Sequence, residues 1–111
     1  MAAANVVNEG SINFGGGIQV IMKELNTLTT DQDEDVAHGG PSGVLPVAVI
    51  PVQTAQATSE ELVTCSWNKA ADSAANNTCR LVFAVENGGS ISGAKFRVYF
   101  VFLQAASGGV S

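Results

Sequence analysis

The sequence has few of the residues that perform enzyme chemistry. It carries one histidine, His38, and two cysteines, Cys65 and Cys79, in 111 residues. His38 lies in a Gly/Pro-rich loop and no G-x-S-x-G motif occurs, so a hydrolytic dyad or triad has no base and nucleophile to build on. Two cysteines and one histidine also lack the paired spacing of a zinc site. We therefore expect a protein that is not an enzyme and that needs no cofactor.

Charged residues are scarce, at 14% of the chain against about 25% in a typical domain. The five basic residues are scattered, and the formal net charge is −5. Binding to nucleic-acid phosphates or to an anionic membrane surface depends on clustered basic residues, so neither partner is expected. A surface this poor in charge predicts contacts between subunits; a monomer with a neutral polar surface is the alternative.

Long hydrophobic runs are absent as well. The longest apolar stretch, VLPVAVIPV (44–52), is interrupted by Pro46 and Pro51 and is too short to span a membrane. Proline removes a backbone donor, so this stretch predicts an edge strand or an extended arm rather than a central strand. The N-terminal MAAANVVNEG has neither the basic nor the apolar region of a secretory signal, so we expect synthesis in the cytoplasm.

Three short apolar runs fill the last third of the chain, residues 60–104. They are ELVTCSW (61–67), CRLVFAVE (79–86) and AKFRVYFVFLQ (94–104). Turn-forming clusters at 68–78 and 87–93 separate them. Period-two alternation of β-branched and aromatic residues predicts strands, and three in succession predict an antiparallel meander. The chain is thus expected to be mainly β, as a small antiparallel sandwich or a barrel-like body.

Alternation gives each of the three runs one apolar face, and these faces predict the core. Its expected residues are Val63, Trp67, Leu81, Phe83, Val85, Phe96, Val98, Phe100 and Phe102. Each buried aromatic brings roughly 1.5–3 kcal/mol by the area removed from water. Exposed instead, Trp67, Phe100 and Phe102 would offer a stacking platform to a sugar, but their alternation with other apolar residues favours the core.

The opposite face of the third run is also apolar at its end. It finishes with Tyr99, Val101 and Leu103, whereas the opposite faces of the first two runs mix polar and small residues. An outer face that becomes apolar predicts a second covering layer or a neighbouring subunit.

The two cysteines fall on the inward faces of adjacent predicted strands. A register that pairs Cys65 with Cys79 also pairs Val63 with Leu81, so a disulfide is consistent with the strand pattern. Such a bond would add about 3 kcal/mol in an oxidising compartment. Two buried thiols are the alternative in a cytoplasmic product.

The N-terminal part gives weaker signals. Residues 1–17 are small, polar and Gly-rich, and predict a flexible or partner-bound arm; residues 18–111 would form a single β-rich domain. The apolar anchors of the arm are Val6, Val7, Ile12 and Phe14. Residues 18–28 fit a strand through Ile18, Val20 and Met22, or one helical face. The helical face has the slightly better count, so one short helix is expected there; this face comprises Ile18, Ile21, Met22, Leu25 and Leu28.

Residues 29–43 predict a loop by composition. The acidic residues in it have the spacing with which a calcium loop begins: Asp31, Asp33, Glu34 and Asp35. However, Val36 stands where such a loop needs glycine, and Ser42 where it needs a bidentate glutamate. A solvated acidic loop is therefore expected rather than a metal site.

Four features together suggest a family. They are the Gly-rich arm GSINFGGG, the proline-spaced VLPVAVIPV, the compact meander ending FRVYFVFLQ and the near absence of chemistry-bearing residues. In these features the chain resembles the small structural proteins of tailed-bacteriophage virions, of the capsid decoration or cement type. The resemblance matches no specific motif, so no functional residue is carried over from it.

The resemblance implies a β-rich body on the exterior of a phage capsid. Such a body would bind the lattice of the major capsid protein, often as a homotrimer whose arms clamp neighbouring shell subunits. The alternative function is a ligand- or carbohydrate-binding β module of the fibre or receptor-binding type.

Overall fold

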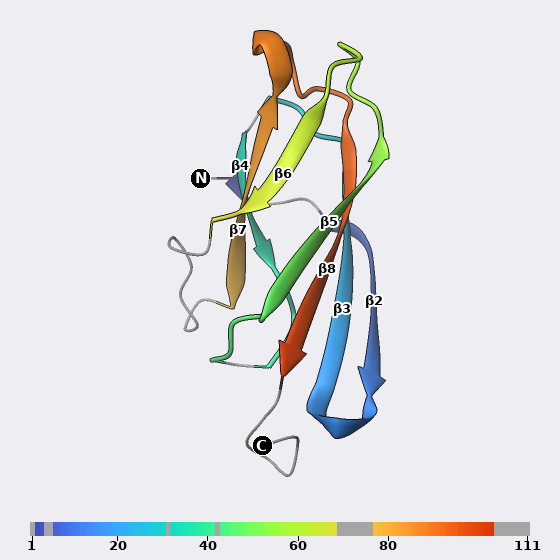
Figure 1. Cartoon of the computed structure of the whole chain (residues 1–111), viewed down its shortest axis with the longest axis vertical. Helices are drawn as coiled ribbons and strands as arrows, with labels where there is room; N and C mark the ends of the chain where they lie inside the picture. The colour runs from blue at the N-terminus through green and yellow to red at the C-terminus, as the bar shows by residue number, and fades with distance from the viewer. Residues whose placement is uncertain (1, 4–5, 31, 42, 69–76, 104–111) are drawn as a thin grey trace.

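The computed structural model describes residues 2–3, 6–30, 32–41, 43–68 and 77–103. They form a β-sandwich of two four-stranded sheets, which lie face to face as two layers (Figure 1). The expectation of a mainly β sandwich is confirmed.

The first sheet has the strand order β1-β4-β7-β6. Its strands are β1 (Ala2–Ala3), β4 (Asp33–Ala37), β7 (Thr78–Val85) and β6 (Val63–Trp67). β1 pairs with β4 in parallel, and the other neighbours pair antiparallel.

The second sheet has the strand order β2-β3-β8-β5, and all its neighbours are antiparallel. Its strands are β2 (Val6–Phe14), β3 (Ile18–Leu25), β8 (Lys95–Leu103) and β5 (Ala48–Ala55). The 3₁₀ turn Gly15–Gly17 joins β2 to β3. Gly16 and Gly17 adopt φ of 78° and 82°, a left-handed conformation that glycine reaches without a Cβ clash.

The core lies between the two sheets. Phe83 of β7 and Phe96 of β8 meet across it with ring centroids 5.3 Å apart. Seven of the nine residues expected in the core are buried: Val63, Leu81, Phe83, Phe96, Val98, Phe100 and Phe102. The other two, Trp67 and Val85, are partly buried and pack against the same cluster. The inward faces read from the alternation are therefore the faces that the structure buries.

The predicted three-stranded meander is wrong in its last step. β6 and β7 pair as neighbours, but β8 belongs to the second sheet, between β3 and β5. Residues 87–93, expected as a hairpin loop, instead carry the chain from one layer to the other (Figure 1). Alternation fixes which face of a strand is buried, but it does not say which strand lies beside it.

The helix considered for residues 18–28 is a strand. β3 is hydrogen-bonded on both sides, to β2 and to β8. Its β-branched residues Ile18, Val20 and Ile21 suit a pleated strand between two neighbours. Pairing with two strands therefore decides the structure of a segment whose apolar residues also fit a helical face. Leu28, which the helical face included, is buried beyond the strand, where its N–H donates to the Ala94 carbonyl at 2.8 Å.

The N-terminal arm is not separate from the β body. Its residues 6–14 form β2, whose pairs with β3 run from Val6 opposite Leu25 to Phe14 opposite Ile18. The boundary expected at residue 17 therefore falls inside a β-hairpin. Val6 packs against the core, whereas Val7, Ile12 and Phe14 are exposed.

Two further segments of the N-terminal half become strands. The expected acidic loop contains β4, which pairs with β7, and its Asp35 carboxylate accepts a hydrogen bond from Arg80 Nε at 3.0 Å. The proline-spaced stretch contains β5, which carries Pro51 and lies at the edge of the second sheet. The edge-strand prediction for residues 44–52 is thus confirmed for 48–52, the part that lies in β5.

A pair of leucine substitutions tests the core. Leu81→Ala should lower the free energy of unfolding by about 2–5 kcal/mol, because Leu81 is fully buried and its removal leaves a cavity. The matched control Leu62→Ala, at a position that is 59% exposed, should change it by less than about 0.5 kcal/mol. Urea unfolding measures both, and equal losses would contradict the burial described above.

Candidate functional site

The outer face of the second sheet is apolar across all four strands. On β8 the even-numbered residues from Phe96 to Phe102 point into the core, so the odd-numbered residues from Lys95 to Leu103 point outward. Cross-strand partners share a face, which extends the outward set to the other three strands. The apolar members of this outer face are Ile12, Phe14, Ile18, Val20, Met22, Ala48, Ile50, Val52, Tyr99, Val101 and Leu103.

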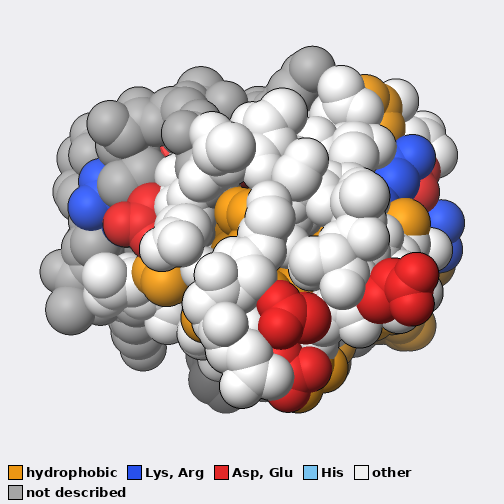
Figure 2. Space-filling model, turned by 90° about the horizontal axis from the view of Figure 1, so that it is seen from above, with side chains coloured by type: hydrophobic (Ala, Val, Ile, Leu, Met, Phe, Trp, Pro, Cys, Tyr) orange, Lys and Arg blue, Asp and Glu red, His pale blue; other side chains and the backbone are white. Residues whose placement is uncertain are grey.

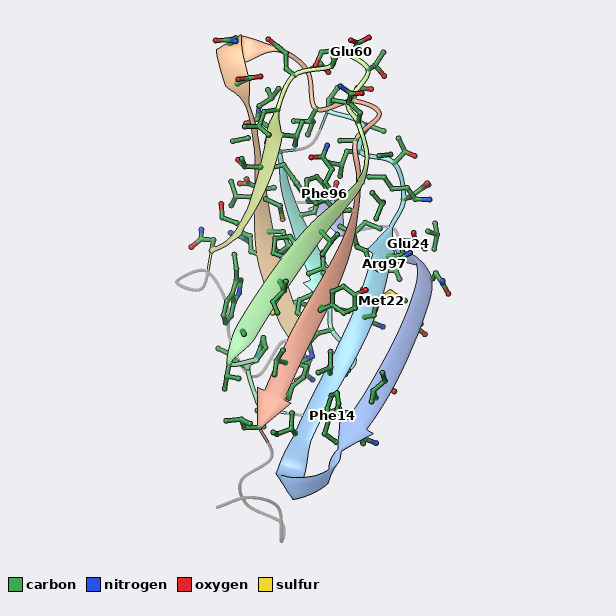
Figure 3. The ribbon with its side chains drawn as sticks, turned by 45° about the vertical axis from the view of Figure 1, so that its right-hand side comes forward. Phe14, Met22, Glu24, Glu60, Phe96 and Arg97 are labelled. Atoms are coloured by element: carbon green, nitrogen blue, oxygen red, sulfur yellow. The ribbon has the colours of Figure 1, made fainter. Side chains whose placement is uncertain are left out.

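These side chains form rows across the sheet. One row runs from Ile12 through Val20 and Val101 to Ala48, and the next contains Met22, opposite Tyr99. Figure 3 shows Met22 midway along the sheet and Phe14 near the β2–β3 turn. The rows make one continuous surface rather than scattered apolar positions.

Much of this surface is open to solvent. Ile12, Phe14 and Ile50 are 60%, 53% and 50% exposed. Single exposed apolar residues are ordinary, but a contiguous exposed patch marks a site of interaction with another macromolecule. The outer face is therefore the candidate functional site.

Charges are confined to one end of the outer face. Arg97 and Glu24 form an ion pair with nitrogen and oxygen 3.5 Å apart (Figure 3). The hydrogen bond with Tyr99, and then the charge of Glu24, raises the pKa of Arg97. Lys95 lies two residues before Arg97 on the same face of β8. The face thus has an apolar expanse and a charged rim.

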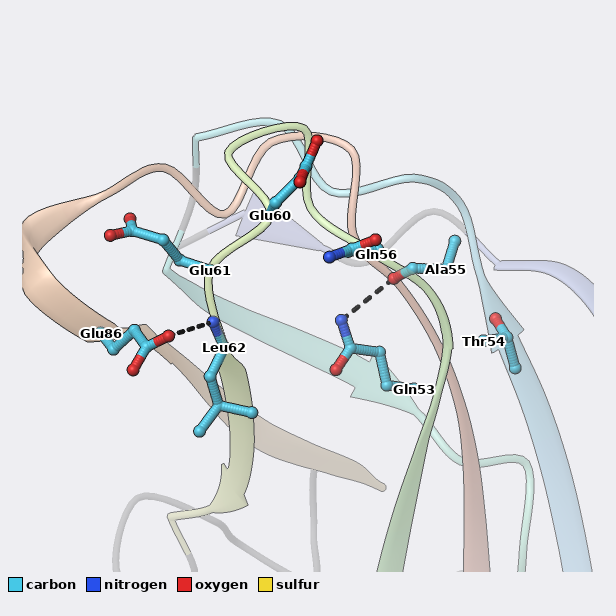
Figure 4. A pocket seen from close by; sticks show the side chains of 8 residues that line it. All are labelled: Gln53, Thr54, Ala55, Gln56, Glu60, Glu61, Leu62 and Glu86. Atoms are coloured by element: carbon cyan, nitrogen blue, oxygen red, sulfur yellow. Dashed lines mark hydrogen bonds between the residues drawn. The ribbon is translucent and has the colours of Figure 1, made fainter.

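A second candidate is an open hollow at the end of the sandwich that carries the 56–62 loop. Its volume is about 540 Å³, and it is lined by Gln53, Thr54, Ala55, Gln56, Glu60, Glu61, Leu62 and Glu86 (Figure 4). The Leu62 N–H donates to Glu86 Oε1 at 2.9 Å, and the Gln53 amide donates to the Ala55 carbonyl at 3.1 Å.

This hollow is acidic and polar. Its lining holds three carboxylates, those of Glu60, Glu61 and Glu86, and no histidine, cysteine, lysine or arginine. Seen from this end, the surface is mostly uncharged, with carboxylate groups standing among backbone and neutral side chains (Figure 2). The arrangement offers carboxylate oxygens and side-chain amides to solvent.

His38 is a packing residue. It is fully buried, its ring centroid lies 4.8 Å from that of Phe102, and its Nδ1 accepts the Gly40 N–H at 2.9 Å. Because Nδ1 accepts, the neutral ring carries its proton on Nε2. A Cβ on Gly40 would lie 2.6 Å from the Phe102 ring, so this close approach requires glycine.

A smaller hollow of about 280 Å³ lies between β2 and the His38 loop. Lys23 and Glu9 form an ion pair beside it. The hydrogen bond from Lys23, and then its charge, holds the pKa of Glu9 below its ordinary value. The pair therefore favours the folded state above the ordinary glutamate pKa, and this contribution is lost as the pH falls through the lowered value.

The cysteines do not face each other. Cys65 lies opposite Phe83, and Cys79 lies opposite Val36, so the register that would pair them is wrong by four residues. Neither cysteine forms a disulfide; Cys79 is buried and Cys65 is partly buried. Burial, and then the negative charge of Glu34, raises the pKa of Cys65 to about 12.

The other residues singled out from the sequence are scattered. Asp31 lies outside the described residues. Its acidic neighbours Asp33, Glu34 and Asp35 are consecutive in β4, so their side chains point alternately to the two faces of the sheet. Among the described residues, no group of three or more His, Cys, Asp or Glu is placed to hold a metal ion. Phe100 and Phe102 are fully buried, so they offer no stacking platform to a sugar.

Comparison with protein-family models, with characterised proteins and with solved structures finds no match for this chain. Among the described residues, no helix has the length and apolar character needed to cross a bilayer. The candidate site is therefore assigned from its own geometry.

Thiol labelling tests the environment of the cysteines. At pH 8 a thiol of pKa about 12 is ionised in roughly one molecule in 10⁴, so native Cys65 should react very slowly with a disulfide reagent such as DTNB. Thr64→Cys, at an exposed position of the same strand, should react rapidly. Unfolding without reductant should release two thiols per wild-type chain, whereas release of none would reveal a disulfide.

Proposed function

We propose that this protein is a non-catalytic structural protein that binds other protein subunits through the outer face of the second sheet. In its specific form, the proposal is a capsid decoration protein on the exterior of a phage shell. The single observation that carries the binding role is the exposed apolar surface shared by β2, β3, β8 and β5. The viral setting comes from the resemblance in sequence character.

The chemistry of the face defines the partner. The sequence has ten acidic and five basic residues. Among the described residues, the charged side chains on the outer face are those of Glu24, Lys95 and Arg97. The face therefore carries a small positive excess on a protein of net charge −5. It fits a shell subunit with an apolar strip and an acidic border, which would meet the Lys95 and Arg97 end.

Burial of apolar side chains supplies the driving force. Each square ångström removed from water contributes roughly 25 cal/mol before the cost of association is subtracted. The strands already fix the backbone, so the freedom lost on docking is that of the exposed side chains. On a symmetric shell the same modest contact is repeated at every equivalent position, which stabilises the lattice as a whole.

A lysine substitution on the outer face tests this function. Ile50→Lys places a charge in the apolar expanse and should weaken binding to decoration-free shells by at least roughly tenfold, because the ammonium would lose water without gaining a partner. The matched control Leu62→Lys changes an equally exposed residue that lies off the face, and it should bind as the wild type does.

Co-sedimentation of each variant with purified shells measures the binding, and urea unfolding checks that both variants are folded. Saturation of shells by Ile50→Lys at wild-type affinity would overturn the proposal, as would failure of the wild-type protein to bind.

A further inference from the structure

Strand β2 is an open edge of the second sheet. It has nine residues, eight of them exposed, and β3 is its neighbour on one side. No described strand lies on its other side. An edge strand of this kind presents unpaired backbone N–H and C=O groups, which can template pairing with another strand.

The other edges of the sandwich are shorter than β2 or interrupted by proline. β5 contains Pro51, which removes a backbone donor, β1 has two residues and β6 has five. Short strands and proline are the usual devices that stop edge-to-edge association. β2 has neither device, and its one charged residue, Glu9, is already held by Lys23.

We propose that β2 is a dimerisation edge, on which β2 of a second copy pairs antiparallel about a twofold axis at Ser11. The pairing would join two second sheets into one continuous sheet of eight strands.

The sequence of β2 favours this register. About Ser11, residues 8–14 of the two copies pair, and Glu9 lies opposite Asn13 of the second copy, whose amide can donate to the carboxylate. An axis at Glu9 would set the two carboxylates directly opposite each other, and an axis at Gly10 would leave them on a diagonal about 7–8 Å apart. An axis at Ile12 would shorten the pairing to residues 10–14. The Ser11 register is the longest of these that separates the two Glu9 side chains.

The apolar side chains of β2 also favour a second copy. Directly opposed residues in an antiparallel pair point to the same side of the sheet. Ile12 and Phe14 are exposed at the rim of the outer face. In this register Ile12 would lie opposite Gly10 and Phe14 opposite Asn8 of the second copy, and the two Ile12 side chains would be diagonal neighbours. The two outer faces would merge into one apolar platform. A twofold pairing of this kind closes on itself as a dimer, in place of the trimer that the resemblance implies.

This inference does not rest on shell binding, because the edge and the outer face are different surfaces of the sheet. A protein that dimerises but does not bind shells would contradict only the proposed function. A monomer that binds shells would contradict only the proposed dimer.

Charge placed at the axis tests the dimer. Wild-type protein should be dimeric by light scattering at micromolar concentration. In Ser11→Lys two ammonium groups would face each other across the axis, so the dimer dissociation constant should rise by at least roughly tenfold. Thr64→Lys, on the exposed side of edge strand β6, should leave the wild-type value unchanged. A monomeric or trimeric wild type, or a Ser11→Lys variant as dimeric as the wild type, would overturn the inference.

Cysteine cross-linking tests the register without destabilising the dimer. Opposed Cα atoms in an antiparallel pair are about 4.5–5.5 Å apart, within reach of a disulfide. Ser11→Cys should therefore form a covalent dimer under mild oxidation. Asn13→Cys should not, because its two Cα atoms would be four residues apart along the pair, or about 13 Å. Equal cross-linking of both variants would contradict the Ser11 axis.

Discussion

The structure depends on β8, whose inward face is apolar throughout and whose outward face is apolar from Tyr99 to Leu103. The inward residues of β8 pack against the first sheet, most visibly where Phe96 meets Phe83, and three of them, Val98, Phe100 and Phe102, are completely buried. The strand is also paired on both edges, by β3 and β5. Its outward residues then determine the character of the outer face. Core and candidate binding surface are thus two sides of the same nine-residue element.

The sequence predicted the faces of the strands better than their neighbours. Period-two alternation identified the buried residues of β6, β7 and β8, because a side chain's direction follows from its position along the strand. It could not place β8 in the other sheet, since the 87–93 connection is short enough for a hairpin and equally able to cross between layers. The edge position could be predicted only for β5, because Pro51 lacks the N–H that a central strand would need for pairing.

Part of the outer face was also visible in the sequence. Tyr99, Val101 and Leu103 indicated an apolar outer side of the third run, and this led to the expectation of a covering layer. The contributions of β2 and β3 were missed, because Ile18 and Met22 were counted on a helical face and Ile12 and Phe14 were assigned to an arm. Only the cross-strand register shows that these residues belong to one surface. The cysteine register failed for the same reason, since side-chain alternation permits any even shift.

The proposed function requires that another protein covers this outer face when the molecule functions. Hydroxyl-radical footprinting tests that claim most directly, because Met22 and Tyr99 are reactive side chains in the middle of the face. If the proposed function holds, protein mixed with decoration-free shells should show both residues protected relative to the free chain, while Leu62, at the far end of the sandwich, keeps its reactivity. Unchanged labelling of Met22 and Tyr99 in the bound state would contradict the account.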